Sequence, residues 1–303
     1  DLHKAIRRQR QMCIRDSNSV LRPIYQLEKD GVAHDFVGLN DNESLDYSQF
    51  EKLLKPNTRM IVCTHASNVT GELLDIDWIS KFCQQHGLLF VLDASQTAGV
   101  IPIDIQLQNI DVLCFTGHKS LFGPQGTGGI CFKKKQKITP LISGGSGIDS
   151  FNHDMPATFP ERLEPGTMNV PGITGLSAGV GYVLKQDPQI LGARALSMAD
   201  TFIKNVRPLP NVILYGNRDV AHTATVGLNI GNLNSSDVSD MLATRYNIAT
   251  RPGAHCAPLV HESLGTKKQG IVRFSFSSFN TDEDTKAAIR AVKLIEHEYE
   301  VEG

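Results

Sequence analysis

From residue 58 onward, short apolar runs alternate with segments of helical spacing, and this alternation constrains the fold more than any other feature. Thr58–Thr64 (TRMIVCT) is apolar and follows a Pro-Asn turn, which predicts a buried strand. Asp75–His86 has apolar residues at helical spacing and stops before Gly87, a residue type typical of a C-cap. Further buried strands are expected at 88–92, 112–115 and 128–132. Apolar strands separated by helices predict an α/β fold, with a mostly parallel sheet and helices on its faces.

The last third of the chain predicts a smaller α+β domain. Strands are expected at 224–230 and 270–276, and helices at 236–246 and 281–298. Thr281 and Asp284 form a start resembling a capping box for the last helix. We therefore expect a large domain over residues 1–190 and a small C-terminal domain over residues 191–303.

Composition excludes several classes of function. The 30 basic and 32 acidic side chains give a net charge of −2, which implies neither a nucleic-acid partner nor an anionic membrane. No apolar run approaches the roughly 20 residues that span a bilayer, and no secretory signal opens the chain, so we expect a cytoplasmic protein. The six cysteines contain no C-x-x-C pair and the ten histidines no H-E-x-x-H spacing, so no metal site is expected.

Lys119 follows the strand expected at 112–115 and lies in a glycine-rich loop. Ligand sites in parallel α/β sheets form beyond the carboxyl ends of the strands. A partly desolvated lysine there can be neutral enough to form a Schiff base. A His-Lys pair beside glycines is also typical of a solvated loop, so Lys119 alone does not decide the function.

Two other polar residues follow strands in the same way. Asp93 closes the strand at 88–92 and fits a metal ligand, a helix cap or a partner for a cationic ring nitrogen. Asn68 follows the strand at 58–64 and fits either a donor to a phenolic oxygen or an Asx turn. We expect these residues and Lys119 to lie at one edge of the sheet.

In combination, five strings resemble the class V aminotransferase family, in its cysteine desulfurase and selenocysteine lyase branch. They are HASNVTG (65–71), DASQTAG (93–99), TGHKSLFGPQGTGG (116–129), RLEPGTMN (162–169) and RPGAHCAPL (251–259). The resemblance is collinear from about Asn18 to the C-terminus. It implies a fold-type-I enzyme that uses pyridoxal 5′-phosphate (PLP) and is usually a homodimer.

The resemblance also implies roles for residues around the cofactor. Lys119 would hold PLP and move the Cα proton of the substrate, and Asp93 would pair with the pyridine nitrogen. The remaining contacts are to the phenolic oxygen (Asn68 and Gln96) and to the phosphate (Thr116 and His118). His118 is grouped with the catalytic residues.

The resemblance implies further roles for residues after Lys119. By the resemblance, Cys256 is the sulfur-accepting cysteine and Arg273 grips the substrate carboxylate, with Arg251 placed in the same substrate site. Arg251 and His255 are expected to supply the positive charge that favours a thiolate at Cys256. Ser146 falls where the family often places a hydroxyl that reaches the phosphate of the partner subunit.

The implied activity converts L-cysteine to L-alanine and leaves a persulfide on Cys256, with L-selenocysteine as the alternative substrate and a sulfur-acceptor protein as a partner. Two alternatives stay open. One is another class V enzyme, such as an aminotransferase, a kynureninase-like hydrolase or an epimerase. The other is a catalytically incomplete, truncated subunit.

The N-terminal segment departs from the family. Residues 1–16 (DLHKAIRRQRQMCIRD) hold five Lys/Arg and no motif, and we expect a foreign junction unrelated to the fold rather than a basic arm. The Gly/Thr turn with which the family cradles the phosphate has no counterpart here. A family Glu-His pair, whose imidazole stacks on PLP, aligns with Asp16 and Ser17. We therefore expect a chain that is truncated at its N-terminus and binds PLP weakly or not at all.

Overall fold

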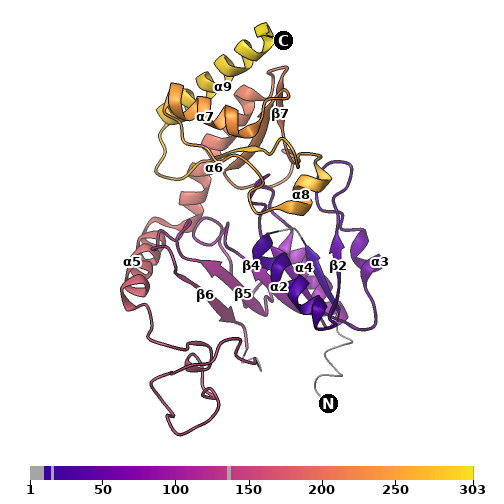
Figure 1. Ribbon diagram of the computed structural model, residues 1–303, viewed down its shortest axis with the longest axis vertical. Helices are drawn as coiled ribbons and strands as arrows, with labels where there is room; N and C mark the ends of the chain where they lie inside the picture. The colour runs from indigo at the N-terminus through magenta and orange to yellow at the C-terminus, as the bar shows by residue number, and fades with distance from the viewer. Residues whose placement is uncertain (1–9, 15–16, 135–137, 303) are drawn as a thin grey trace.

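A six-stranded sheet in the order β2-β1-β3-β4-β5-β6 forms the larger half of the molecule (Figure 1). The computed structural model describes residues 10–14, 17–134 and 138–302. Neighbouring strands are parallel except for β6, which is antiparallel to β5. The strands are β1 (Arg10–Ile14), β2 (Ala33–Val37), β3 (Thr58–Thr64), β4 (Leu89–Asp93), β5 (Val112–Thr116) and β6 (Gly128–Phe132).

Helices cover both faces of this sheet, as expected. On β3, Ile61 and Cys63 join the core under α4 (Ile76–His86) and α3 (Gln49–Leu53). The alternate residue Val62 packs against the buried side of α2 (Asn18–Lys29). Because successive side chains of a strand point to opposite faces, β3 is buried on both sides. The expected αL C-cap of α4 is confirmed, since Gly87 has a φ of 63°.

Strand β1 corrects the expectation for the N-terminal segment. Arg10–Ile14 pairs in parallel with both β2 and β3, so the expectation that residues 1–16 are unrelated to the fold is wrong for these five residues. The physical reason is that the main-chain N–H and C=O groups of two neighbouring strands need hydrogen-bond partners. Any short extended segment between them can provide these partners, whatever its side chains. The other residues of the segment lie outside the described residues.

A second, three-stranded antiparallel sheet forms a separate core near the C-terminus. Its strands β7 (Val212–Leu214), β8 (Thr225–Ile230) and β9 (Val272–Ser275) lie in that order. Its core is completed by α6 (Pro188–Val206), α7 (Ser235–Tyr246) and α9 (Asp282–Glu302). The capping box of α9 is confirmed, because Thr281 N donates to Asp284 Oδ2 and Asp284 N to Thr281 Oγ1.

Two long helices and a loop-rich segment connect the sheets. Residues 133–169 contain only the short 3-10 helix Glu161–Leu163 among the described residues, and α5 (Val170–Gln186) and α6 follow. The latter half of α6 packs in the second core, whereas a Cβ at Gly192 would meet the Val100 carbonyl. The proposed domain boundary at 190/191 therefore falls inside α6, which contacts both halves.

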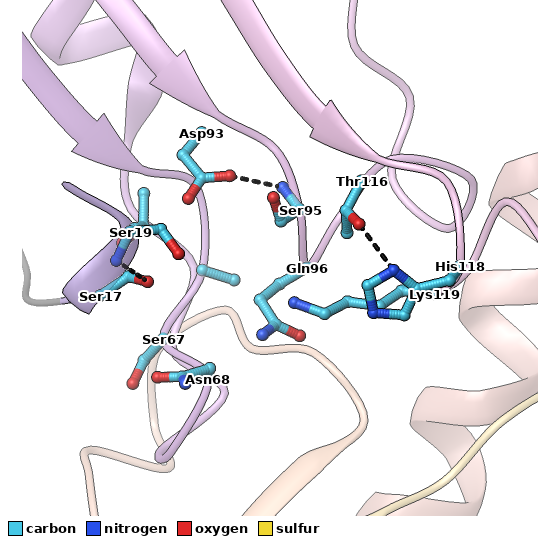
Figure 2. A pocket seen from close by; sticks show the side chains of 12 residues that line it. Ser17, Ser19, Ser67, Asn68, Asp93, Ser95, Gln96, Thr116, His118 and Lys119 are labelled. Atoms are coloured by element: carbon cyan, nitrogen blue, oxygen red, sulfur yellow. Dashed lines mark hydrogen bonds between the residues drawn. The ribbon is translucent and has the colours of Figure 1, made fainter. Parts of the chain in front are cut away.

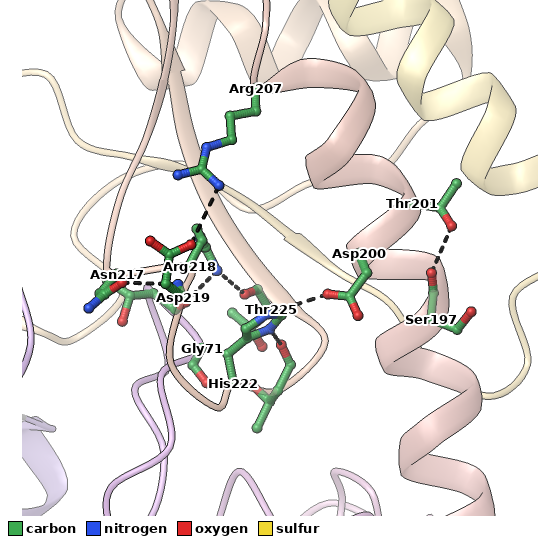
Figure 3. A network of polar contacts seen from close by, with 12 residues as sticks. Gly71, Ser197, Asp200, Thr201, Arg207, Asn217, Arg218, Asp219, His222 and Thr225 are labelled. Carbon is green, nitrogen blue, oxygen red and sulfur yellow. Dashed lines mark hydrogen bonds and ion pairs between the residues drawn. The ribbon is translucent and has the colours of Figure 1, made fainter.

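A polar network joins the loop before β8 to the loop after β3 (Figure 3). Arg218 Nη1 donates to the Thr70 carbonyl at 2.8 Å, and Thr223 N donates to the Gly71 carbonyl at 2.7 Å. Gly71 has a φ of +76°, and a Cβ there would lie 2.4 Å from the Thr225 carbonyl oxygen. Glycine is thus required where the two halves meet.

Candidate active site

Three neighbouring strands end at one edge of the larger sheet, and the loops that follow them form a cavity of about 220 Å³ (Figure 2). The cavity is lined by residues from the ends of β3, β4 and β5 and from the start of α2: Ser17, Ser19, Thr64, Ala66, Ser67, Asn68, Asp93, Ser95, Gln96, Thr116, His118 and Lys119. The structure thus brings together six of the residues singled out in the sequence. Ser17 was singled out only as a departure from the family's Glu-His pair, and the other serines and Thr64 were assigned no role from the sequence.

Lys119 lies in a loop that packs closely on the loop after β4. Gly123 N donates to the Gly117 carbonyl at 2.8 Å, which folds the Lys119 loop back on itself. A Cβ at Gly99 would lie 2.3 Å from the Ser120 carbonyl oxygen, and Gly99 has a φ of +95°. The glycine of DASQTAG is therefore needed to hold the Lys119 loop against its neighbour.

The environment of Lys119 favours the neutral amine. Lys119 lines the cavity and is exposed as a residue, yet surrounding protein atoms displace part of the water around its ammonium group. This partial burial is the largest cause that lowers the pKa of Lys119; Asp93 acts in the opposite direction, and Arg273 and Arg251 lower it further. A lysine with a lowered pKa is a better nucleophile toward a carbonyl carbon.

Asp93 presents a free carboxylate oxygen to the same cavity. Its Oδ1 accepts a hydrogen bond of 2.9 Å from Ser95 N, as in an Asx turn. Within the described part of the chain, no donor reaches Oδ2. The carboxylate can therefore accept the N–H of a cationic ring in the cavity.

Thr116 and His118 form a polar pair beside Lys119. Thr116 Oγ1 lies 2.8 Å from His118 Nδ1, and both side chains line the cavity (Figure 2). Gln96 reaches the cavity from the neighbouring loop. A hydroxyl, an imidazole and an amide are together suited to bind an anionic oxygen group.

Asn68 connects the cavity to two distant segments. Its Nδ2 donates to the His255 carbonyl at 2.6 Å, and its own carbonyl accepts a hydrogen bond of 3.0 Å from Arg273 Nη1. The side-chain amide has two N–H donors and one acceptor, so it keeps capacity for a ligand. Asn68 is therefore both a cavity residue and a junction between the first and last thirds of the chain.

Cys256 is exposed, does not line the cavity and has a left-handed backbone conformation. His255 and Cys256 have φ values of 51° and 57°, a left-handed conformation that costs about 1–3 kcal/mol for each non-glycine residue. The hydrogen bond from Asn68 brings this loop to the cavity wall.

The expectation that His255 supplies positive charge to the Cys256 thiol is wrong. His255 is only 3% exposed as a residue, and burial lowers the pKa of its imidazole to about 4. The imidazole is therefore neutral near neutral pH. The sequence could not show this, because the burial of the ring depends on the tertiary fold.

Arg273 does not line the cavity, and part of its guanidinium has no hydrogen-bond partner among the described residues. Nη1 is bonded to the Asn68 carbonyl, but the buried Nε has no hydrogen-bond partner within the described part of the chain. The Nε and Nη2 edge suits a bidentate contact with a carboxylate. Arg251 is exposed and pairs with Arg273 only through the main chain, with N···O distances of 3.2 and 2.9 Å.

Two serines considered in the sequence differ in their position relative to the cavity. Ser146 is half-buried in the 133–169 segment, donates to the Ile148 carbonyl at 3.0 Å and does not line the cavity. Ser17 lines the cavity and caps α2 by accepting a hydrogen bond from Ser19 N. Asp16, the other position aligned with the Glu-His pair, lies outside the described residues.

The chain matches a known protein family over most of its length. The sequence profile of the family described as aminotransferase class-V matches residues 6–287. The chain belongs to this family. The match starts ahead of Asn18, where we expected the resemblance to begin.

Relatives within the family are cysteine desulfurases. A probable cysteine desulfurase of Pyrococcus abyssi is 31% identical over 277 residues, which cover 89% of this chain and 68% of the relative. The cysteine desulfurase CsdA of Escherichia coli is 30% identical over 258 residues, which cover 84% of this chain and 63% of the relative. The crystal structure of that CsdA matches with a TM-score of 0.83 at 25% identity, over 96% of this chain and 76% of that chain.

The relatives are longer than the part of them that this chain matches. The chain spans between 60% and 68% of the length of the first curated relatives.

Class V aminotransferases depend on PLP, and the cavity residues fit this cofactor. The free Oδ2 of Asp93 suits the protonated ring nitrogen, and the lowered pKa of Lys119 suits a bond to the aldehyde carbon. Thr116 and His118 would hold the phosphate, and Asn68 and Gln96 the phenolic oxygen.

The described residues offer no competing metal site or membrane segment. No three or more His, Cys, Asp or Glu side chains of the described ranges are arranged to hold a metal ion. Likewise, none of the helices in these ranges has the length and apolar character to cross a membrane.

Proposed function

We propose that this chain is a PLP-dependent cysteine desulfurase, which converts L-cysteine to L-alanine and leaves the sulfur as a persulfide on Cys256. The observation that carries the proposal is the contact between Asn68 and the His255 carbonyl, because it holds an exposed cysteine loop against the PLP cavity. The names of the relatives support the same reaction.

Arg273 and Lys119 have separate roles in the proposed reaction. Arg273 holds the substrate carboxylate through its Nε and Nη2 edge, which fixes the Cα–H bond relative to Lys119. Lys119 takes the Cα proton, because its lowered pKa makes the neutral amine available. Bound PLP supplies the electron sink that stabilises the resulting negative charge.

Cys256 then acts as the nucleophile. Its thiolate sulfur attacks the substrate sulfur, so that an S–S bond forms while the Cβ–S bond breaks. The electron pair of the broken bond remains with the substrate carbon skeleton, which takes up protons to give alanine. Lys119 returns a proton to Cα. A sulfur-acceptor protein would remove the persulfide sulfur, and the same residues would process L-selenocysteine.

A homodimer in the cytoplasm is part of the proposal. Apolar side chains in the 133–169 segment are strongly exposed, including Leu141 at 97% and Phe151 at 100%. A surface of this kind is typical of a protein interface. Ser146 lies in the same segment, and in a dimer it would reach the phosphate site of the partner subunit.

One observation favours a second candidate, a subunit that folds but lacks full activity. Ser17 lines the cavity at the position where the family has the stacking histidine. A hydroxyl cannot replace an aromatic ring against the cofactor. Another class V activity is less favoured, because an aminotransferase, hydrolase or epimerase has no use for the Cys256 loop.

Alanine release tests the proposal. The purified chain with PLP and L-cysteine is expected to release alanine and sulfide in equal amounts in the presence of a thiol reductant. The Cys256→Ser variant should retain the absorbance of bound PLP and lose persulfide formation. Alanine without Cys256 persulfide would remove the nucleophile assignment. Bound PLP without alanine would favour the incomplete subunit.

A further inference from the structure

The loop that presents Cys256 is built over a buried histidine. Both His255 and Cys256 adopt the left-handed conformation, but His255 is buried whereas Cys256 is exposed. The flanking turn is closed by a hydrogen bond of 2.8 Å from Ala257 N to the Ala254 carbonyl. Two successive left-handed residues without glycine persist only where the surroundings hold them.

The His255 ring makes one contact that fixes the loop, on the side of the small sheet. Nε2 lies 2.8 Å from the Ile271 carbonyl, and because a carbonyl only accepts, Nε2 carries the proton and donates. Ile271 precedes β9, and its own N donates to the Gly253 carbonyl. The ring also stacks on His261 at a centroid distance of 6.1 Å and an interplanar angle of 20°. His261 Nδ1 is in turn fixed at 2.7 Å from Thr266 Oγ1.

The main chain of His255 makes a second contact that fixes the loop, on the side of the larger sheet. Its carbonyl accepts the 2.6 Å hydrogen bond from Asn68 Nδ2. One residue thus binds Ile271 through its ring and Asn68 through its carbonyl. These two contacts fix the main chain on one side of Cys256, and Asn18 N adds a hydrogen bond of 2.9 Å to the Cys256 carbonyl itself.

We propose that His255 is a positioning residue for Cys256, which acts as a neutral anchor of the loop through the Nε2–H donation to Ile271. This inference rests on the proposed desulfurase function for its kinetic consequence, but the loop geometry stands without it. Attack on the substrate sulfur requires the thiolate to approach along one direction, so a loose loop lowers kcat. Binding of L-cysteine depends on Arg273 and changes little.

A matched pair of amide substitutions tests the anchor. In His255→Gln the side-chain nitrogen can reach the Ile271 carbonyl, whereas in His255→Asn the shorter side chain leaves it out of reach. Each variant carries one neutral amide. Asparagine adopts the left-handed conformation of position 255 more readily than glutamine, so backbone strain alone would favour His255→Asn and only the difference in reach favours His255→Gln. We expect His255→Asn to lower kcat for persulfide formation at least tenfold with a KM for cysteine within threefold of the parent. His255→Gln should restore most of the loss.

Amide hydrogen exchange provides a measurement that does not depend on turnover. Peptides covering 253–258 should exchange at least tenfold faster in His255→Asn than in the parent and His255→Gln, while peptides from α9 remain unchanged as a control for global folding. Equal kcat and equal exchange in the two variants would overturn the proposal. If the parent chain makes no persulfide, the proposed function fails, and the exchange comparison alone still decides the role of His255.

Discussion

Asn68 Nδ2 donates a hydrogen bond of 2.6 Å to the carbonyl of His255, which lies 187 residues further along the chain. This contact joins the wall of the PLP cavity to the loop that presents Cys256. The carbonyl of Asn68 is in turn held by Arg273, the proposed carboxylate ligand. The proposed cofactor site, the proposed carboxylate ligand and the loop of the proposed sulfur-accepting cysteine are therefore all in contact with one residue.

Asn68→Asp is expected to weaken this junction. The carboxylate removes the donor and places a second acceptor beside the His255 carbonyl. Loss of a partner for a buried acceptor costs about 1–3 kcal/mol, so the free energy of unfolding should fall by that amount in urea denaturation. Asn68→Ala removes the donor without adding charge and should cost less. Equal stability of both variants and the parent would contradict the role of this hydrogen bond.

The lowered pKa of Lys119 predicts a shifted pH dependence of labelling. Because partial burial disfavours the ammonium form, the neutral amine appears at lower pH than in a free lysine side chain. Competitive labelling with an amine reagent, read by peptide mass spectrometry, should place the midpoint for Lys119 below the ordinary lysine value.

Asp93→Asn provides the control for this shift. Asp93 is the charge that raises the pKa of Lys119, so its removal should move the labelling midpoint further down. An unchanged or higher midpoint would show that the carboxylate does not act on the lysine.

His65 should make the protein sensitive to acid. Its ring is buried, its Nδ1 lies 2.8 Å from Thr97 Oγ1, and burial lowers its pKa from 6.5 to about 4. Between these values the unfolded state binds more protons, so the free energy of unfolding falls as the pH is lowered from about 6.5 to about 4. The loss approaches about 3 kcal/mol per such histidine.

His65→Gln removes one of the buried rings whose pKa is lowered by burial; His255 and His261 are the others among the described residues. The dependence of unfolding free energy on pH should therefore be shallower in His65→Gln than in the parent. Identical slopes over this pH range would mean that the ring is accessible to protons in the folded state.

Ser17→His should strengthen PLP binding. Ser17 lines the cavity at the position of the family's stacking histidine, so an imidazole there can contact the cofactor ring. Aromatic pairs contribute about 0.5–1.5 kcal/mol beyond area burial, which corresponds to roughly twofold to tenfold in affinity. Titration with PLP, followed by visible absorbance, measures the gain. Ser17→Leu adds apolar volume without a ring and should gain less.

The positions of the main elements could be predicted because they depend on local patterns. The strand at Thr58–Thr64 and the end of α4 at Gly87 were expected and are found at those positions. Asp93 and Lys119 lie at one edge because parallel strands place their carboxyl ends together, which the alternation of strands and helices already implied.

The contacts between distant segments could not be predicted in the same way. The bonds from Asn68 and Arg273 go to main-chain carbonyls, which every residue has, so no side-chain pattern marks them. The neutrality of His255 likewise depends on burial by the tertiary fold. The strand Arg10–Ile14 escaped prediction because its place between β2 and β3 depends on main-chain hydrogen bonds.

Attachment of PLP to Lys119 tests the central claim most directly. The purified chain is mixed with PLP, its visible absorbance is recorded, and borohydride reduction is followed by peptide mapping. We predict a visible band that disappears on reduction, with a stable pyridoxyl adduct on the peptide containing Lys119 and none in Lys119→Ala. A saturating concentration of PLP that gives neither the band nor the Lys119 adduct would contradict the assignment of this cavity as a PLP site.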